Sequence, residues 1–453
     1  MKQNIFFITL DSCRSDKFYG KNKTSVTPNI DELIKKGVYF EQTISSADST
    51  LLAITSLFTG KYPFKTGIRS ERFNKLKEGV STFFKILHNN GYHHYAYNPT
   101  VTKTIGLMPD FENEDSNYDY HFDLSDGLGK KIIEKLKSKL NEPWCFYIHA
   151  NDLHFPVDVV KEFDNEKFGM SKYERMISSI DSWIGKFAEK IDLEKTLFII
   201  TADHATFVPS INVNNKTLSF EVDAKKHKIS RIMQKKLPEN LKPLRSKVFF
   251  ALEKIRKQRK NQILEKLDLK PHEKRALLWQ RGDLDSTLFD DQVHIPLLLF
   301  GPNIPKDKKI SHLTRQIDIF PTLVDLSGIS AKNEPDGVSL VPLLQGKTME
   351  ESPVYMESTP LIQKKANDVI GIRTSNYKYF RDCDDPKKRI HLYDLINDPF
   401  EEKNVAESHP ETVSEMEDVL QVTINEKITK YDEEFSEKEA KMIEDELQRL
   451  GYI

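Results

Sequence analysis

The 453-residue chain has few cysteines, no long apolar run and almost no net charge. Its three cysteines are too few for a disulfide framework, and none lies in a Cys-x-x-Cys pair typical of a structural metal site. No stretch of about 18 apolar residues occurs, so we expect no membrane-spanning helix. The formal net charge of −2 gives no overall attraction to nucleic acid or to anionic membranes, and we expect no nucleic-acid partner.

The start of the chain is also poor in signals. The apolar stretch after residues 1–4 is shorter than that of a signal peptide, and no cleavage site follows it. Together with the low cysteine content, this start predicts a cytoplasmic, reducing location. Internal repeats and low-complexity tracts are absent, and 38% hydrophobic with 30% charged residues is the composition of a globular protein.

Apolar strand-like runs alternate with amphipathic helical stretches up to about residue 205. Residues 144–148 are typical of a buried strand, and residues 27–33 of a helix start with Pro28 in its first turn. The alternation resumes with an apolar run at 295–300 and a helical stretch at 317–326. This pattern predicts an α/β fold, a doubly wound and mostly parallel sheet with helices on both faces.

We expect two parts, an α/β catalytic core at residues 1–350 and a smaller C-terminal α+β subdomain at residues 351–453. In the second part, residues 368–373 and 377–381 predict a small antiparallel sheet. The polar stretch at 436–450 predicts a terminal helix.

A basic segment interrupts the core, and we expect a helical insertion at about residues 206–285. Residues 221–281 contain 19 Lys and Arg against 7 Asp and Glu. Apolar residues recur between them at roughly helical spacing, namely Val248, Leu252, Ile255, Ile263 and Leu267. The pattern predicts one apolar stripe and one basic face. Two interpretations stay open: a solvated lid that packs on the core, or a basic surface that attracts an anionic substrate or makes peripheral contact with a membrane.

Two of the expected buried strands end in a carboxylate. Asp11 follows the apolar run at residues 4–10, and Asp203 follows the run at 196–202, with His204 next to it. Open parallel sheets place their active sites at the carboxyl ends of their strands. A buried carboxylate must be paired, hydrogen-bonded or bound to a cation. The two strand ends therefore predict one shared metal site.

Two further segments carry polar groups that suit the binding of an anion. Arg14 lies close to Asp11 and can grip an anion through two N–H groups, although a strand-end aspartate also commonly caps the next helix. Residues 46–63 place hydroxyl groups at a loop-to-helix junction, where the positive end of the helix dipole favours an alkoxide or an oxyanion. The alternative is that Ser49 or Thr50 is simply an N-cap.

Ten short segments follow one another in the order of a known family pattern. They are residues 10–16, 27–31, 50 with 57–63, 149–156, 201–204, 294–297, 318–323, 336–340, 372–374 with 377–379, and 392–395 with 398–399. Through them the chain resembles the sulfatase-like branch of the alkaline phosphatase superfamily. Each segment is a weak signal, but ten in register across nearly the whole chain are a strong one.

The resemblance implies roles for the residues at the matching positions. Asp11, Asp203 and His204 would be ligands of one divalent ion, Mn²⁺, Zn²⁺ or Ca²⁺. Thr50 would be the nucleophile, with its oxygen bound to the same ion. His154 would neutralise the oxyanion or protonate the leaving group.

Four more residues are candidate contacts of the substrate. Arg14 would hold the substrate anion, and Lys61 would lie near it in the segment 57–63. Asn98 corresponds loosely to a substrate-contact position and is equally typical of a turn. His149 is either a substrate ligand or a histidine of the core with its hydrogen bonds satisfied.

The chain departs from the sulfatase pattern at the nucleophile. Sulfatases carry a Cys, sometimes a Ser, in a Cys-x-Pro-x-Arg context that is converted to formylglycine, whereas this chain has Thr50, Leu52 and Ile54. The resemblance associates threonine nucleophiles with phosphoryl-transferring branches, and phosphorus accepts direct in-line displacement. Ser12 replaces a second Asp of many sulfatases, and the family's lysine before residues 294–296 is missing.

The expected function is a metal-dependent hydrolase that cleaves a phosphodiester, a phosphonate ester or a sulfate ester through Thr50. Its substrate would be an anionic small molecule or a glycan- or lipid-linked ester. Two alternatives stay open: a phosphoethanolamine- or phosphoglycerol-type transferase, and a catalytically inactive binding protein. Release of product to water, dependence on an acceptor alcohol, and metal binding without turnover distinguish the three.

Overall fold

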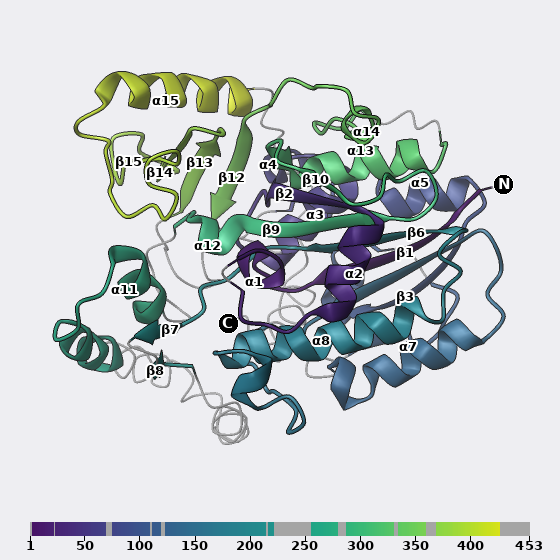
Figure 1. The fold of residues 1–453 in the computed structure, drawn as a ribbon. Helices are drawn as coiled ribbons and strands as arrows, with labels where there is room; N and C mark the ends of the chain where they lie inside the picture. The colour runs from purple at the N-terminus through teal and green to yellow at the C-terminus, as the bar shows by residue number, and fades with distance from the viewer. Residues whose placement is uncertain are drawn as a thin grey trace, which may run out of the picture.

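The fold was obtained as a computed structural model. It describes residues 2–21, 23–68, 75–108, 111–118, 123–213, 216–221, 255–279, 287–329, 334–358 and 368–425. Its centre is a nine-stranded sheet in the order β10-β2-β9-β6-β1-β5-β3-β4, with β11 paired to β2 (Figure 1). Strand β9 runs antiparallel to both of its neighbours, and the other pairs are parallel. The predicted mostly parallel α/β sheet is confirmed.

The strands of this sheet come from the whole length of the core. They are β1 (Asn4–Leu10), β2 (Val38–Ile44), β3 (His93–Pro99), β4 (Asn117–Tyr118), β5 (Trp144–Ala150), β6 (Thr196–Ala202), β9 (His294–Phe300), β10 (Lys308–Ile310) and β11 (Thr314–Arg315). Every residue of β1, β5 and β6 is buried. These three adjacent central strands are therefore covered on both faces, as their continuous apolar runs predict.

Helices cover both faces of the sheet and give a three-layer molecule (Figure 1). One face carries α3 (Thr50–Thr59), α5 (Phe83–Asn89), α6 (Thr100–Thr104), α13 (Gln316–Leu326) and α14 (Val341–Leu344). The other carries α1 (Ser15–Phe18), α2 (Pro28–Lys36), α7 (Leu128–Lys137) and α8 (Lys172–Ala188). Among the described helices, none is long and apolar enough to cross a membrane.

Side chains of the central strands alternate between the two faces, and this alternation positions the site. In β1, Ile5 and Phe7 pack on the α3 face, whereas Phe6 and Ile8 pack on the α8 face. Thr9 is in register with His149 of β5 and Thr201 of β6. Because side chains repeat with a period of two along a strand, the next residues on the α3 face are those just beyond the strand ends. The side chains at the ends of these strands therefore lie on the face of the sheet that α3 covers.

Helix α3 is almost wholly buried and is stopped by a glycine. Nine of its residues are buried, and Gly60 at its C-cap adopts φ +66°. A Cβ at Gly60 would lie 2.8 Å from Phe320 and 2.9 Å from Pro335. Glycine fits this left-handed, crowded position, where other residues are strained. The helix axis is thus fixed, and its first residue, Thr50, is held at the opposite end.

The C-terminal part has its own four-stranded sheet, in the order β12-β13-β14-β15. Its elements are β12 (Val354–Ser358), β13 (Val369–Arg373), β14 (Tyr377–Asp382), β15 (His391–Asp394) and α15 (Pro410–Asn425). All three strand pairs are antiparallel, as predicted for residues 368–373 and 377–381. The helix predicted at 436–450 lies outside the described residues. The boundary between the parts at residue 350 stays a prediction.

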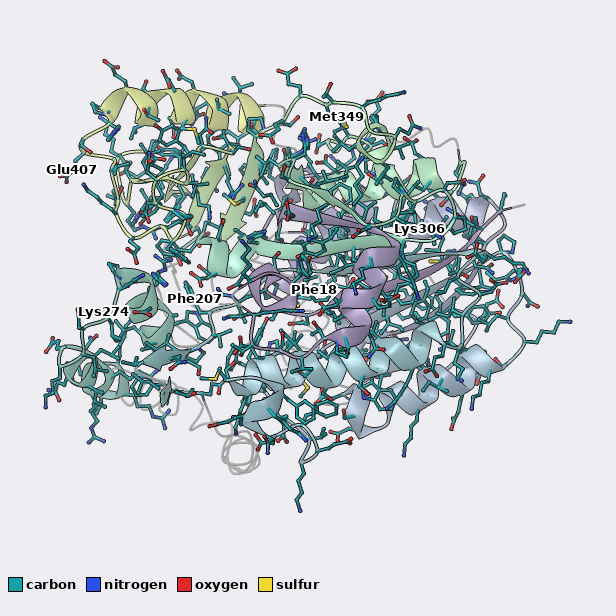
Figure 2. The ribbon with its side chains drawn as sticks, viewed as in Figure 1. Phe18, Phe207, Lys274, Lys306, Met349 and Glu407 are labelled. Atoms are coloured by element: carbon teal, nitrogen blue, oxygen red, sulfur yellow. The ribbon has the colours of Figure 1, made fainter. Side chains whose placement is uncertain are left out.

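The insertion is described in part. It contains β7 (Ser210–Val213), β8 (Lys216–Ser219), a helix over residues 255–264 and α11 (Pro271–Leu278). Its own small core is formed by Leu264, Leu269 and Leu277. The buried Phe207 packs against Ala276 of α11 and joins the insertion to the core, whereas Lys274 points outward (Figure 2).

The predicted apolar stripe of the insertion needs correction. Ile255 and Ile263 are 45% and 47% exposed, and the buried residue of this helix is Leu264. The helix turns Leu264 inward because α11 and the β7–β8 hairpin pack on that side. Leu267 is partly buried and packs against the core of the insertion, as predicted. Val248 and Leu252 lie outside the described residues, so their part of the stripe stays a prediction.

Candidate active site

Three strand ends bring buried ligand atoms together. Asp11 after β1, His149 at the end of β5 and Asp203 after β6 each offer one atom, and these atoms lie within 4.8 Å of one another. All three residues are fully buried. The Nε2 atom of His149 lies 3.5 Å from Oδ2 of Asp11. The sequence predicted a shared site at two strand ends, and the structure adds a third.

Hydrogen bonds to the Oδ1 atoms orient the carboxylates of Asp11 and Asp203. Oδ1 of Asp11 accepts from the Ser12 hydroxyl at 2.6 Å, and Oδ1 of Asp203 accepts from the backbone N–H groups of Ser12 at 3.0 Å and His204 at 2.7 Å. Oδ2 of Asp203 accepts no hydrogen bond from the described part of the chain and lies 3.6 Å from Nε2 of His204. A buried carboxylate oxygen without a donor is costly, and a bound cation would satisfy it.

The electrostatics of the two carboxylates differ. Burial raises the pKa of Asp11, but a hydrogen bond with His149 and the charges of His154 and His204 outweigh it and hold this pKa below its ordinary value. Burial, followed by the negative charge of Asp11, raises the pKa of Asp203. Two neighbouring buried carboxylates resist ionising together unless a positive charge lies between them. The pair therefore fits a cation.

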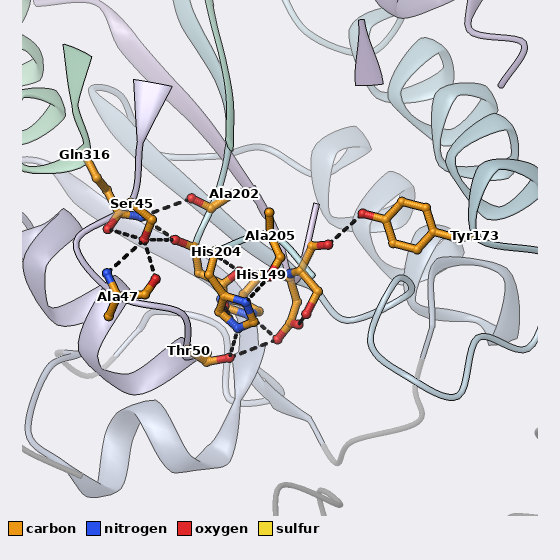
Figure 3. Close-up of polar contacts among 12 residues, drawn as sticks. Ser45, Ala47, Thr50, His149, Tyr173, Ala202, His204, Ala205 and Gln316 are labelled. Atoms are coloured by element: carbon orange, nitrogen blue, oxygen red, sulfur yellow. Dashed lines mark hydrogen bonds and ion pairs between the residues drawn. The ribbon is translucent and has the colours of Figure 1, made fainter. Parts of the chain in front are cut away.

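Two histidines face this pair with their Nε2 atoms (Figure 3). Nδ1 of His204 donates to the carbonyl of Ala205 at 2.7 Å, which leaves Nε2 of the neutral ring as the acceptor. Nδ1 of His149 is hydrogen-bonded to the hydroxyl of Tyr147 at 3.0 Å. A hydrogen bond on the distal ring nitrogen is the usual way in which a metal-binding histidine is oriented.

Thr50 points at the same cluster. As the first residue of α3 it is 2% exposed, and its hydroxyl lies 3.3 Å from Oδ2 of Asp11 and 3.3 Å from Nε2 of His204. Ser49 occupies the N-cap position but makes no capping hydrogen bond with its side chain. The Thr50 hydroxyl thus points toward the candidate metal ligands.

A buried amide fixes the loop of Thr50 to the end of β6, in an arrangement we call the Gln316 clamp. Nε2 of Gln316 donates to the carbonyls of Asp203 at 2.6 Å and Ala202 at 3.2 Å. Its Oε1 accepts from the hydroxyl of Ser45 at 3.1 Å, and the same hydroxyl contacts the carbonyl of Asp203 at 2.7 Å (Figure 3). Gln316 and Ser45 are fully buried. Neither Ser45 nor Gln316 belongs to a recognisable motif, so neither could be predicted from the sequence.

Arg14 has other partners in the structure. Its Nε and Nη2 donate to the two carboxylate oxygens of Asp16 at 2.8 and 3.0 Å, and its Nη1 pairs with Asp291. Burial works against its charge, but the two aspartates raise its pKa well above the ordinary value. The expected contact with a substrate anion stays a prediction and would require one of these pairs to open.

Lys61 and Asn98 were also expected to contact the substrate, but neither lies in the cluster of strand-end residues. Lys61 lies beyond the C-terminal end of α3, roughly 15 Å along the helix from Thr50, and donates to the carbonyl of Glu334. Asn98 is fully buried, donates to Asn117 at 3.1 Å and accepts from Thr102 at 3.0 Å. Asn98 lies within β3 and is paired with Asn117 of β4, so the turn interpretation is wrong, and its contact with substrate stays a prediction. The position of Lys61 beyond the far end of α3 corrects its expected role.

His154 lies on the loop that follows β5. It is partly buried, its backbone N–H donates to the carbonyl of Asn151 at 2.9 Å, and its charge lowers the pKa of Asp11. His149, considered a substrate ligand or a core histidine, is instead one of the three clustered strand-end residues. The pairing of His149 with Thr9 places it beside Asp11, but the pairing of residues between two strands cannot be read from the sequence.

The residues present fit one divalent cation. Asp11, Asp203, His149 and His204 would hold it, with the Thr50 oxygen beside them. Carboxylate and imidazole donors together suit Zn²⁺, Mn²⁺ and related ions.

The chain was compared with known families and proteins. The sulfatase family model matches residues 3–329, and the model of the C-terminal part of N-sulphoglucosamine sulphohydrolase matches residues 284–430. A delta 4,5-hexuronate-2-O-sulfatase of Bacteroides thetaiotaomicron is 24% identical over 415 residues, covering 86% of this chain and 81% of that protein. Chicken arylsulfatase K is 31% identical over 145 residues, covering 31% of this chain. The match spans 27% of chicken arylsulfatase K, and a match to the mouse protein spans 52% of that protein.

Solved structures show the same fold. A putative sulfatase of Bacteroides thetaiotaomicron has a TM-score of 0.66 at 17% identity, over 94% of this chain and 92% of that one. The phosphonate monoester hydrolase of Agrobacterium radiobacter has a TM-score of 0.66 at 17% identity, over 94% of this chain and 96% of that one. With the sulfatase model matched over most of its length, the chain belongs to the sulfatase family.

Proposed function

We propose that this protein is a hydrolase of phosphate, phosphonate or sulfate esters that uses Thr50 as its nucleophile. The observation that carries the proposal is the position of the Thr50 hydroxyl, 3.3 Å from both Asp11 Oδ2 and His204 Nε2 at the start of α3. Both neighbours are acceptors for its proton, so the hydroxyl is placed to become an alkoxide. The N-terminus of α3 adds a favourable dipole for negative charge there.

A divalent cation held by Asp11, Asp203, His149 and His204 would supply Lewis-acid chemistry, lowering the pKa of the Thr50 hydroxyl and withdrawing charge from the ester. The protein contributes the geometry around it. Ser12 orients both carboxylates, Tyr147 and Ala205 orient the two rings, and the Gln316 clamp fixes the spacing between Thr50 and the end of β6. Such preorganisation avoids the cost of ordering these groups during the reaction.

The reaction would proceed in two displacements. The Thr50 oxygen attacks the phosphorus or sulfur atom, and the bond to the leaving-group oxygen breaks as His154 gives that oxygen a proton. Water then attacks the same atom of the Thr50 ester and gives a proton back to His154. The bond to the Thr50 oxygen breaks, and this oxygen takes back the proton held by Asp11 or His204. We favour phosphorus over sulfur because a plain threonine ester must be opened by direct attack, and phosphoryl groups accept in-line displacement.

The relatives support both ester classes. One solved structure with this fold is a phosphonate monoester hydrolase, and one curated relative is a hexuronate sulfatase. We therefore propose an anionic ester substrate and prefer the phosphonate monoesters and phosphodiesters.

A substrate panel tests the proposal. Aryl sulfate, phosphate monoester, phosphodiester and phosphonate monoester substrates are compared for wild type, Thr50→Ala, Thr50→Ser and Thr55→Ala. Thr55 is the matched control, because it lies in the same helix, is fully buried, and donates its hydroxyl proton to the carbonyl of Leu51 at 2.6 Å instead of to a site residue. We expect kcat to fall by roughly 10³-fold or more in Thr50→Ala, to survive in part in Thr50→Ser, and to be unchanged in Thr55→Ala.

A kcat in Thr50→Ala within about tenfold of wild type on any of these esters would overturn the nucleophile assignment. Transfer to an added alcohol without release to water would favour the transferase alternative. Cation binding with no turnover on the whole panel would favour an inactive binding protein.

A further inference from the structure

Ser12 makes hydrogen bonds to both carboxylates of the candidate metal site. Its backbone N–H donates to Oδ1 of Asp203 at 3.0 Å, and its hydroxyl donates to Oδ1 of Asp11 at 2.6 Å. With both Oδ1 atoms occupied, Oδ2 of each carboxylate faces the histidines. One residue thus sets the rotation of two carboxylates that come from different strands.

The backbone of Ser12 adopts an unusual conformation to reach both. Its φ is +61°, in the left-handed region that residues with a Cβ rarely adopt. Tyr173 of α8 holds the turn, because its hydroxyl donates to the carbonyl of Ser12 at 2.7 Å and accepts from the N–H of Arg14 at 2.9 Å. Figure 3 shows Tyr173 reaching this turn from the side opposite the histidines. A strained residue held by a buried side chain is a mark of preorganisation.

Serine at this position also limits which atoms can bind a cation. The Ser12 hydroxyl directs its proton to Oδ1 of Asp11 and adds no charged oxygen to the site. The remaining donors are the carboxylates of Asp11 and Asp203, the Thr50 oxygen, and Nε2 of two histidines. Imidazole donors suit Zn²⁺ and other first-row transition metals, whereas Ca²⁺ takes six to eight oxygen ligands.

We propose that Ser12 is the positioning residue of this cation site, and that the site, with two histidines and only two carboxylates, binds a first-row transition metal in preference to Ca²⁺. The inference rests on the proposed function only in requiring a cation between these donors. It assigns no step of the ester reaction.

Calorimetric titration of the full-length protein, stripped with a chelator, tests the inference without turnover. We expect wild type to bind Zn²⁺ and Mn²⁺ at least tenfold more tightly than Ca²⁺. Ser12→Gly deletes the hydroxyl, and glycine accepts the positive φ. We expect this variant to bind Zn²⁺ about 10–100-fold more weakly, the usual effect of losing a group that orients a metal ligand. Its thermal unfolding midpoint without metal should not fall.

Three further variants sharpen the test. Ser15→Ala is the matched control, because Ser15 is buried in the same segment but is hydrogen-bonded to Tyr39 at 2.9 Å instead of to a ligand. It should bind Zn²⁺ as wild type does. Tyr173→Phe should weaken Zn²⁺ binding in the same direction as Ser12→Gly. Ser12→Asp adds a third carboxylate and should raise the Ca²⁺ affinity relative to that for Zn²⁺.

Wild-type affinity for Zn²⁺ in Ser12→Gly would overturn the positioning role, and tighter binding of Ca²⁺ than of Zn²⁺ by wild type would overturn the selectivity. Because no titration depends on the nucleophile, a failed assignment of Thr50 would leave these affinities unchanged. The two proposals therefore fail separately.

Discussion

Substitution of Gln316 by leucine should destabilise the protein and slow its reaction together. The change removes two hydrogen bonds from Nε2 to the carbonyls of Asp203 and Ala202, and one from the hydroxyl of Ser45 to Oε1. All of these groups are fully buried, so water cannot replace the lost partners. At about 1 kcal/mol for each lost bond, with a further penalty for unpaired groups, we expect a loss of about 2–4 kcal/mol in unfolding free energy.

The same substitution should lower kcat by about 10–100-fold, because the clamp sets the distance between Thr50 and the end of β6. Urea unfolding and steady-state kinetics measure the two effects. Thr322→Val is the matched control on α13, since Thr322 is buried and bonds the carbonyl of Asp318 at 2.6 Å and the N–H of Leu340 at 2.9 Å. Thr322→Val should lower the unfolding free energy by about 1–2 kcal/mol and leave kcat unchanged.

A double-mutant cycle with Ser45→Ala examines the clamp itself. The hydroxyl of Ser45 lies within hydrogen-bond distance of both Oε1 of Gln316 and the carbonyl of Asp203, to which the amide of Gln316 also donates. We expect their effects on stability to be non-additive by about 1 kcal/mol. Additive effects, or a loss below about 0.5 kcal/mol in Gln316→Leu, would refute the reasoning.

The remaining predictions concern charge and metal. Burial, followed by the neighbouring carboxylates, raises the pKa of Asp123 to about 7, so the folded state holds a proton that the unfolded state releases near pH 4. The contribution of Asp123 to the unfolding free energy should therefore fall as the pH rises from about 4 to about 7 and then level off. Asp123→Asn should flatten this dependence, as measured by urea unfolding at pH 5 and 8. Lys378 is fully buried and forms ion pairs with Asp290 and, at 2.7 Å, with Glu401. Lys378→Met should lower the unfolding free energy by about 3–5 kcal/mol in urea unfolding. A loss below about 1 kcal/mol would contradict a buried ion pair at this position. A chelator should abolish turnover and lower the midpoint of thermal unfolding, and adding the cation back should reverse both effects. Full activity after verified removal of the metal would count against the cation site.

The sheet and two of its strand ends could be predicted because their signals are local. The apolar runs before Asp11 and Asp203 mark buried strands by composition alone, and the topological rule for open sheets places their ends at a site. The antiparallel pair β13–β14 of the C-terminal sheet was predictable for the same reason, since a short turn separates the two strands, whereas β12 and β15 were not predicted.

The rest depends on register, which a single sequence does not contain. His149 joins the site because Thr9 lies opposite it in the pairing of β1 with β5. The roles of Ser12 and Gln316 depend on a positive φ and on the packing of α13 against β6, neither of which is visible in local composition. Lys61 was misplaced because a motif shows spacing along the chain and does not show which end of a helix faces the site.

The most direct test of the central claim, that Thr50 forms a covalent ester during turnover, is mass spectrometry of the acid-quenched enzyme. A phosphonate or phosphate ester with a fast leaving group is mixed with wild type and with Thr50→Ala, and the modified peptide is sequenced. The account predicts an added phosphonyl or phosphoryl group on Thr50 in wild type and none in the variant. Turnover with no adduct, or with an adduct on a different side chain, would contradict it.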